Sequence, residues 1–221
     1  MGSTGSRDAG FGYQDMLDVV QVNWDGKIIW KFSEYELIKD PDHKSIRMAR
    51  QHHDYQREGN PVGYYAPGMD PTIDRGNTLI LCHKNVKNSN ISDKTLLDDT
   101  IIEVNWKEGD LVWEWICSEH FNEMGFSEEA INTLYRLPHP MKIQSGEVGD
   151  WMHMNSVSLV GPNKWYEGGD ERSANIIAII SRKTGKIVWQ IGPDYTASPL
   201  KEIGQIVGQH HAHIIPGSLP S

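Results

Sequence analysis

The chain has 221 residues, of which 38% are hydrophobic, and its formal net charge at pH 7 is −9. This length suits one large domain or two small ones, and no apolar run approaches the roughly 18 residues of a membrane-spanning helix. Acidic and basic side chains are interspersed, so the sequence lacks the basic face that proteins need to bind nucleic acid. An anionic substrate is compatible with this charge, because a local pocket can oppose the sign of the whole protein.

Neither the N-terminus nor the cysteines identify a cellular compartment. Residues 1–15 lack the apolar stretch of a secretory signal peptide, and we predict that they are disordered. Cys82 and Cys117 lie in apolar segments typical of strands, where two buried free thiols are expected in preference to a disulfide. The localisation is therefore unknown from the residues alone.

One pattern occurs three times along the chain: a strand, a tight turn that ends in glycine, two aliphatic residues and a tryptophan. The copies are "VNWDGKIIWKF" at 22–32, "VNWKEGDLVWEW" at 104–115 and "ISRKTGKIVWQI" at 180–191. Each copy is typical of a β-hairpin in which glycine adopts a positive φ. Further strands are predicted at 77–82, 100–106 and 174–180.

Repeated hairpins at nearly equal spacing are typical of the blades of a β-propeller. We therefore predict an all-β fold with about three blades, in repeats near 16–95, 96–170 and 171–221, and a β-sandwich is the alternative. Trp30, Trp113 and Trp189 hold the same place in each repeat and are expected to pack between blades. Because propellers have roughly 4–8 blades, a missing C-terminal half or a second copy would be needed to close the ring. The uncovered edges predict a chain that associates or is poorly soluble.

One segment departs from the β pattern. Residues 127–140 begin with Ser127, a good N-cap, continue with two glutamates and end with two prolines. These signals predict a short helix near 127–136, inserted into the second repeat.

Histidines follow the three tryptophans in phase with the repeat: His53, His153 and His210. The middle interval is longer, and the predicted helix lies within it. Because equivalent positions on successive blades converge near the central channel, we expect these imidazoles to surround one point. Such a cluster can bind a transition metal, or it can bind an anion and perform nucleophilic and acid–base catalysis.

Metal binding and anion binding require different neighbouring residues, and the sequence contains candidates for both. A metal would use a carboxylate such as Asp54 or Asp150, or the i, i+2 pair His211 and His213. An anion would use an arginine, and Arg172 directly precedes an apolar strand. A third hypothesis is a non-catalytic interaction propeller whose histidines cap the blades.

Four segments resemble the arylsulfotransferases, the aryl-sulfate sulfotransferases that use no nucleotide sulfate donor: "HHDYQ", "GDWMHMNSV", "RSANIIAIISRKTGKIVWQIGPD" and "GQHHA". The resemblance extends from about residue 20 to the end of the chain. It implies a six-bladed β-propeller that transfers a sulfuryl group from an aryl sulfate to a phenol through a sulfohistidine, with no metal or organic cofactor. Members of the family are roughly twice as long and are usually exported, which suggests a periplasmic or secreted location.

The resemblance also assigns the site residues. His210, which directly follows Gln209, would be the nucleophile, and in an extended segment its side chain faces away from its neighbour His211. His53, His153 and Arg172 match positions in the family motifs and would be catalytic groups. Asn155, which also matches a motif, and His211, which adjoins one, would be substrate contacts.

Overall fold

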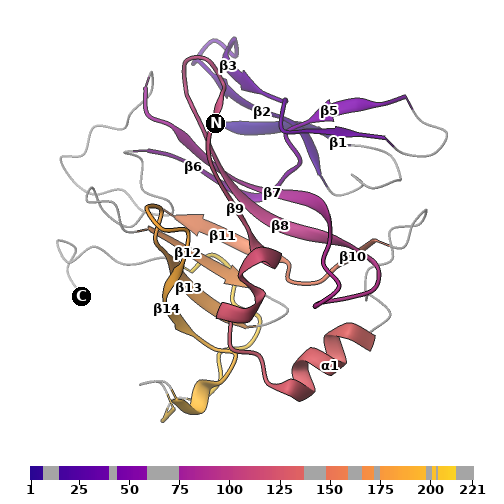
Figure 1. Ribbon diagram of the computed structural model, residues 1–221. Coiled ribbons are helices and arrows are strands. Elements are labelled where there is room, and N and C mark those ends of the chain that lie inside the picture. The colour runs from indigo at the N-terminus through magenta and orange to yellow at the C-terminus, as the bar shows by residue number, and fades with distance from the viewer. Residues whose placement is uncertain are drawn as a thin grey trace.

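The computed structural model of the protein describes residues 1–6, 15–39, 44–58, 75–136, 148–158, 166–171, 175–197, 201–202 and 204–212. These residues form fourteen strands, one α-helix and two 3-10 helices, and the larger sheet is curled like half of a barrel (Figure 1). The fold is therefore mostly β, as the hairpin pattern predicted. No helix in the described ranges is long and apolar enough to cross a membrane.

The larger sheet contains eight strands. Its order is β1-β2-β6-β7-β8-β10, with β3 paired to β2 and β9 paired to β8, and all pairs are antiparallel except β8 with β10. The strands are β1 (Gly2–Ser6), β2 (Met16–Val22), β3 (Ile28–Phe32), β6 (Gln51–Arg57), β7 (Thr78–Lys87), β8 (Thr95–Val104), β9 (Leu111–Ile116) and β10 (Val148–Asp150). A separate two-stranded sheet pairs β4 (Glu36–Ile38) with β5 (Ile46–Met48).

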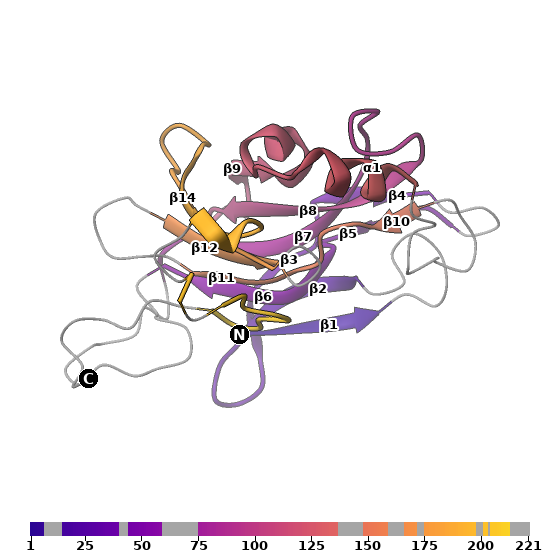
Figure 2. The ribbon, with the colours of Figure 1, turned by 90° about the horizontal axis from the view of Figure 1, so that it is seen from below.

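The second large sheet is an antiparallel meander of four strands in chain order. Its strands are β11 (Met154–Ser158), β12 (Tyr166–Glu171), β13 (Ile176–Ile180) and β14 (Ile187–Ile191). Within the first sheet, β6 to β9 form an equivalent four-stranded meander. The two meanders lie side by side, with β11 in contact with β6 and β7 (Figures 1 and 2).

The three predicted hairpins are all present, as β2–β3, β8–β9 and β13–β14. Their turn glycines have φ values of 81°, 77° and 70°, in the left-handed region that favours glycine. The register shifts at the same place in each hairpin, between Gln21 and Val22, between Glu103 and Val104, and between Ile179 and Ile180. The sequence repeat is therefore also a repeat of backbone geometry.

The three tryptophans differ in burial, so the prediction that all of them pack between repeats is wrong for Trp189. Trp30 is buried beneath the guanidinium of Arg57, which lies 5.0 Å from its ring centroid. Trp113 is half-buried against the larger core cluster, whereas Trp189 is 46% exposed. Trp189 lies on β14, a strand in which no residue is buried, whereas Trp30 and Phe32 are both buried on β3.

The elements outside the sheets partly match expectation. The helix α1 (Glu128–Arg136) begins after Ser127, whose Oγ accepts a hydrogen bond from the backbone N–H of Ala130 at 3.2 Å, so the predicted N-cap is confirmed. The 3-10 helices η1 (Cys117–Glu123) and η2 (Tyr195–Ala197) were not predicted. Gly2–Ser6, within the segment expected to be disordered, pair with β2 as β1.

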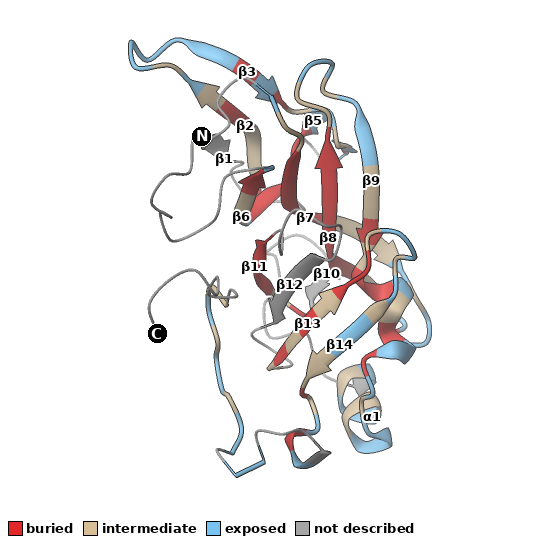
Figure 3. Cartoon of the chain, turned by 90° about the vertical axis from the view of Figure 1, so that its left-hand side faces the viewer, coloured by how far each residue is buried: buried red, intermediate tan, exposed pale blue. Residues whose placement is uncertain are grey.

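Burial concentrates on the strands where the two meanders meet. Figure 3 shows β6, β7, β8 and β11 as mostly buried, and long stretches of β3, β9 and β14 as exposed or half-buried. Cys82 and Cys117 are both buried and neither is in a disulfide, as expected. The middle of β8 is unusual, because Asp98, Asp99 and Thr100 are fully buried among apolar neighbours. A buried carboxylate needs hydrogen-bond or ion-pair partners. The partners of these carboxylates belong to the candidate site or adjoin it.

Candidate functional site

His53 lies in a bulge of β6. The pairs Gln51↔Cys82 and Tyr55↔Ile80 leave three residues of β6, 52–54, opposite the single residue Leu81 of β7. His53 has a φ of +48°, in a region that non-glycine residues seldom adopt. A bulge breaks the alternation of side chains along a strand and redirects them. The bulge therefore turns His53 out of the β6–β7 ladder.

His153 and Asn155 lie in a similar irregularity at the start of β11. His153 has a φ of +61°, and the pairs Met154↔Glu171 and Ser156↔Asp170 leave Asn155 without an opposite residue on β12. Asn155 is buried, and its Nδ2 donates a hydrogen bond to the backbone oxygen of His153 at 3.0 Å. Left-handed backbone at non-glycine residues is concentrated at functional sites.

His210 belongs to segment 208–212, which is tied to the second sheet at three points. The backbone N–H of Gly208 donates to Asn175 Oδ1 at 2.9 Å, and Gln209 Nε2 donates to the Ile176 oxygen at 3.1 Å. Near its end, the Ala212 oxygen accepts from Ser156 Oγ at 3.3 Å. These bonds hold the segment while the side chain of His210 stays exposed.

The structure brings the three predicted histidines together. The ring centroids of His53 and His153 are 4.7 Å apart, and those of His53 and His210 are 5.7 Å apart. His211 is half-buried with a φ of +64°. Arg172 and His213 lie outside the described residues. The grouping that the repeat phase predicted is thus present, and the chemical roles of its members stay predictions.

Carboxylates of the first sheet fix the segment that carries His153. Asp99 Oδ2 accepts from the Met154 N–H at 3.1 Å, and Asp54 Oδ2 accepts from the Val157 N–H at 3.0 Å. Asp98 Oδ1 accepts from Trp151 Nε1 at 2.7 Å. The position of His153 relative to His53 is therefore set by carboxylate bonds between the two sheets.

A second group of titratable side chains lies directly behind His53, and the sequence did not predict it. His52 Nε2 is 3.0 Å from Asp99 Oδ1, and the rings of His52 and His83 stack with centroids 3.7 Å apart. His83 Nδ1 is 2.5 Å from Asp15 Oδ1, and Arg50 Nε is 2.6 Å from Asp15 Oδ2. The sequence does contain a signal for this second group, because polar residues interrupt the otherwise apolar strands β7 and β8.

The electrostatics of this second group follow from its burial. Burial lowers the pKa of His52 well below its ordinary value, and the neighbouring histidines His83, His53 and His153 lower it further, so His52 is neutral. Burial alone would raise the pKa of Asp15, but the charges of Arg50 and His83 outweigh it and the pKa lies below its ordinary value. For Asp98, burial raises the pKa to about 6.

His52, His83 and Asp99 also have ligand atoms within 4.8 Å of one another, close enough for the ligands of one metal ion. An imidazole nitrogen binds a metal through a lone pair in the plane of its ring. The two rings are tilted by only 7° and stack face to face, so their planes do not meet near the site. In this geometry the two histidines cannot bind one ion together.

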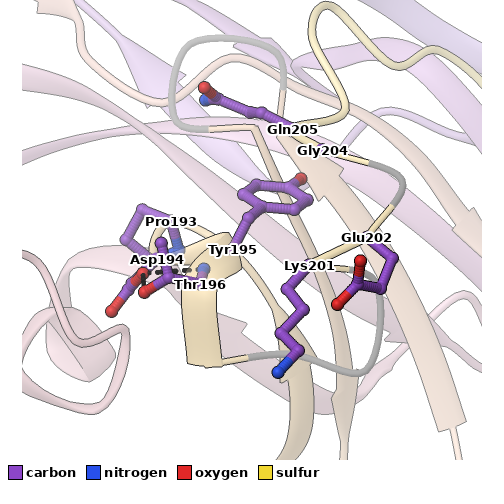
Figure 4. Close-up of a pocket in the computed structure, with 8 residues that line it drawn as sticks. All are labelled: Pro193, Asp194, Tyr195, Thr196, Lys201, Glu202, Gly204 and Gln205. Carbon is purple, nitrogen blue, oxygen red and sulfur yellow. Dashed lines mark hydrogen bonds between the residues drawn. The ribbon is translucent and has the colours of Figure 1, made fainter.

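A surface hollow formed by residues that follow β14 contains none of the predicted site residues (Figure 4). It is lined by Pro193, Asp194, Tyr195, Thr196, Lys201, Glu202, Gly204 and Gln205. Asp194 is engaged within the hollow, since its Oδ1 accepts from the Thr196 hydroxyl at 2.6 Å. Two carboxylates against one lysine make the hollow a poor place for an anion.

Comparison with known families identifies the class of this protein. A model described as Arylsulfotransferase (ASST) matches residues 71–203. Because the match spans more than half of the chain, the chain belongs to the arylsulfotransferase family, whose activity in general is aryl sulfotransfer. The matched range includes His153, Asn155 and Arg172, whereas His53 and His210 lie outside it. Comparisons with curated proteins and with solved structures returned no match.

Proposed function

We propose that this chain is an aryl-sulfate sulfotransferase that moves a sulfuryl group from an aryl sulfate to a phenol through a sulfohistidine at His210. The observation that carries the proposal is the convergence of His53, His153 and His210 in a chain of the arylsulfotransferase family. The three histidines come from three separate parts of the fold: β6, the start of β11 and the segment after β14.

His210 suits the nucleophile for reasons of access and support. Its side chain is exposed, and the bonds of Gly208 and Gln209 to the second sheet limit the motion of its backbone. A nucleophile must meet the substrate in a fixed direction, because orientation supplies a large part of the rate acceleration.

The proposed reaction has two transfers. In the first, a neutral ring nitrogen of His210 attacks sulfur, the bond from sulfur to the aryl oxygen breaks, and the leaving phenolate takes a proton from a neighbouring imidazolium. In the second, the acceptor phenol gives its proton to that imidazole while its oxygen attacks sulfur, and the bond between nitrogen and sulfur breaks. His53 and His153 are the described groups that can hold this proton, since histidine titrates near physiological pH.

Binding of the substrates would fall to the remaining predicted residues. Fixed positive charge lowers the barrier by stabilising the sulfuryl oxygens in the transition state, and Arg172 is proposed for this role. Among the described residues, the buried Asn155 Oδ1 has no hydrogen-bond donor. We propose that this oxygen accepts a hydrogen bond from the hydroxyl group of the phenol, and that His211 is a second contact to the phenol.

We further propose that the two meanders are neighbouring propeller blades whose first strands, β6 and β11, face the channel. The contact of β11 with β6 supports this arrangement. The meanders, at 51–116 and 154–191, cross the bounds of the repeats near 16–95, 96–170 and 171–221. On this proposal they belong to a six-bladed ring that is completed by further blades or by a second copy. Sedimentation at several concentrations tests the second copy, and a monomer at every concentration would contradict it.

Turnover tests the function directly. The chain is expected to release one equivalent of coloured phenol from a chromogenic aryl sulfate without an acceptor, and to release it continuously only when a second phenol is supplied as acceptor. His210→Asn should abolish release, whereas the matched neighbour His211→Asn should weaken substrate binding and retain turnover. Equal loss in both variants, or full activity of His210→Asn, would contradict the assignment of the nucleophile.

A further inference from the structure

We infer that His52 and Asp99 are positioning residues that fix which ring nitrogen of His53 faces the reaction site. The inference rests on the proposed function for its catalytic meaning, but its geometry stands independently. It goes beyond the family motifs in the sequence, which assign His53 and leave its neighbour His52 without a role.

The chain of contacts runs from a carboxylate through one imidazole to the next. Asp99 Oδ1 lies 3.0 Å from His52 Nε2, and His52 Nδ1 lies 3.0 Å from His53 Nδ1. His52 and Asp99 are both almost fully buried, so water does not weaken the contact between them, whereas His53 is exposed. The contact between the two Nδ1 atoms is a hydrogen bond, whereas the contact between Asp99 and His52 has the distance but not the geometry of one.

The carboxylate determines where the hydrogen on His52 lies. An ionised oxygen repels a nitrogen lone pair and attracts an N–H, so Asp99 favours the tautomer of His52 that carries its hydrogen on Nε2. The N–H is not aimed straight at Oδ1, and the preference is therefore mainly electrostatic. Because His52 is neutral, its Nδ1 then has a free lone pair.

That lone pair determines the state of His53. His52 Nδ1 accepts the Nδ1–H of His53, which leaves the Nε2 of His53 directed away from the buried pair. In neutral His53 this nitrogen is a base, and in the imidazolium it is an acid. This is the proton carrier that the two transfers require, and the buried pair keeps it in the useful tautomer.

The surroundings hold the pair rigidly. His83 stacks on the His52 ring at 3.7 Å and is itself bonded to Asp15 at 2.5 Å. Asp99 also accepts the Met154 N–H at 3.1 Å, so one carboxylate orients His52 and anchors the strand that follows His153. Neither ring nor carboxylate can turn without breaking a buried contact.

The second bond of Asp99 makes Asp99→Asn a decisive variant. In the variant the amide oxygen must face the Met154 N–H, so the NH₂ group faces His52 Nε2. His52 is then forced to carry its hydrogen on Nδ1, and neutral His53 must carry its own on Nε2, where it no longer acts as a base. The shape of the side chain is unchanged, which separates loss of the tautomer from loss of packing.

The test is nitrogen NMR on the full chain with ¹⁵N-labelled histidine. In the wild type we expect a protonated Nδ1 on His53 and a coupling across the hydrogen bond between the two Nδ1 atoms. In Asp99→Asn we expect the proton of neutral His53 to move to Nε2, and kcat to fall by about 10²–10⁴-fold with little change in KM. The matched control is Asp98→Asn, the next residue of β8, which contacts Trp151 and should leave the His53 signals unchanged.

The outcomes separate the inference from the proposed function. A wild type with His53 protonated on Nε2, or an Asp99→Asn variant with unchanged His53 signals, overturns the inference even if turnover is found. The expected signals and their shift support it even if aryl sulfate is not turned over, and in that case only the proposed function fails. The wild-type spectrum alone decides the point if Asp99→Asn does not fold.

Discussion

The molecule contains two groups of histidines side by side, and they differ in almost every physical respect. The site group is His53, His153 and His210, of which two have left-handed backbone and two, His53 and His210, are exposed. The buried group is His52 and His83, which stack on each other and are held by Asp15 and Asp99. Residue type is the same in both groups, so access and hydrogen-bond partners decide which histidines can react and which can only support. The predictions below test this division.

The largest expected effect is on turnover and concerns the site group. His153→Asn should lower kcat by about 10²–10⁴-fold, because a proton donor or acceptor near sulfur is removed. Asparagine tolerates the left-handed backbone of His153, where φ is +61°, so the free energy of unfolding should stay nearly unchanged. Kinetics and denaturant unfolding of the same preparation check both parts. A variant that loses stability and keeps its kcat would show that His153 has a structural role, like the histidines of the buried group.

The corresponding change in the buried group should affect stability first. Asp15→Ala removes the partner of Arg50 and His83 and leaves a buried guanidinium with one fewer carboxylate. Breaking a buried ion pair by removal of one member typically costs about 3–5 kcal/mol. Urea unfolding measures this cost. A loss below about 1 kcal/mol would show that the buried group is not a structural support.

The next effect depends on pH and belongs to Asp98. Its pKa in the folded state is about 6, raised from 3.8 by burial, so its protonated form is favoured by folding. The stability it contributes is present below about pH 4 and is lost as the pH rises to about 6. Relative to Asp98→Asn, the wild type should therefore lose up to about 3 kcal/mol between these pH values. His52, whose lowered pKa acts in the opposite direction, is present in both proteins and cancels from the difference.

The smallest effect is expected at Trp189, in contrast to the equivalent repeat position Trp30. Trp30→Ala should destabilise by about 3–5 kcal/mol, because the side chain is buried. Trp189→Ala should change the free energy of unfolding by less than about 1 kcal/mol, because 46% of the residue is exposed. Equal losses at the two positions would mean that an assembly partner covers Trp189, which unfolding at several protein concentrations can detect.

The sequence predicted the features that local signals encode. Turn glycines, tryptophans at a fixed place and the N-cap Ser127 identify the three hairpins and α1, because each depends on a few adjacent residues. The phase of the histidines with the repeat correctly predicted that His53, His153 and His210 come together. Burial of Trp189 was predicted wrongly, since it depends on a neighbour of β14 that no local pattern describes.

The buried group escaped prediction for a different reason. Asp15, His83 and Asp99 are separated by long stretches of chain and meet only because β7 and β8 pair and segment 15–22 lies alongside. The bulge in β6 was equally hidden, since alternation along a strand does not show where an extra residue is inserted. Polar residues inside apolar strands were the one available signal, and they indicate that partners exist without naming them.

The central claim is that His210 carries the sulfuryl group between donor and acceptor. Incubation of the full chain with an aryl sulfate and no phenol, followed by peptide mass spectrometry, tests it most directly. The account predicts one sulfuryl group on the His210 side chain, which disappears when a phenol is added. Turnover that proceeds while the group is found on another residue, or on none, would contradict it.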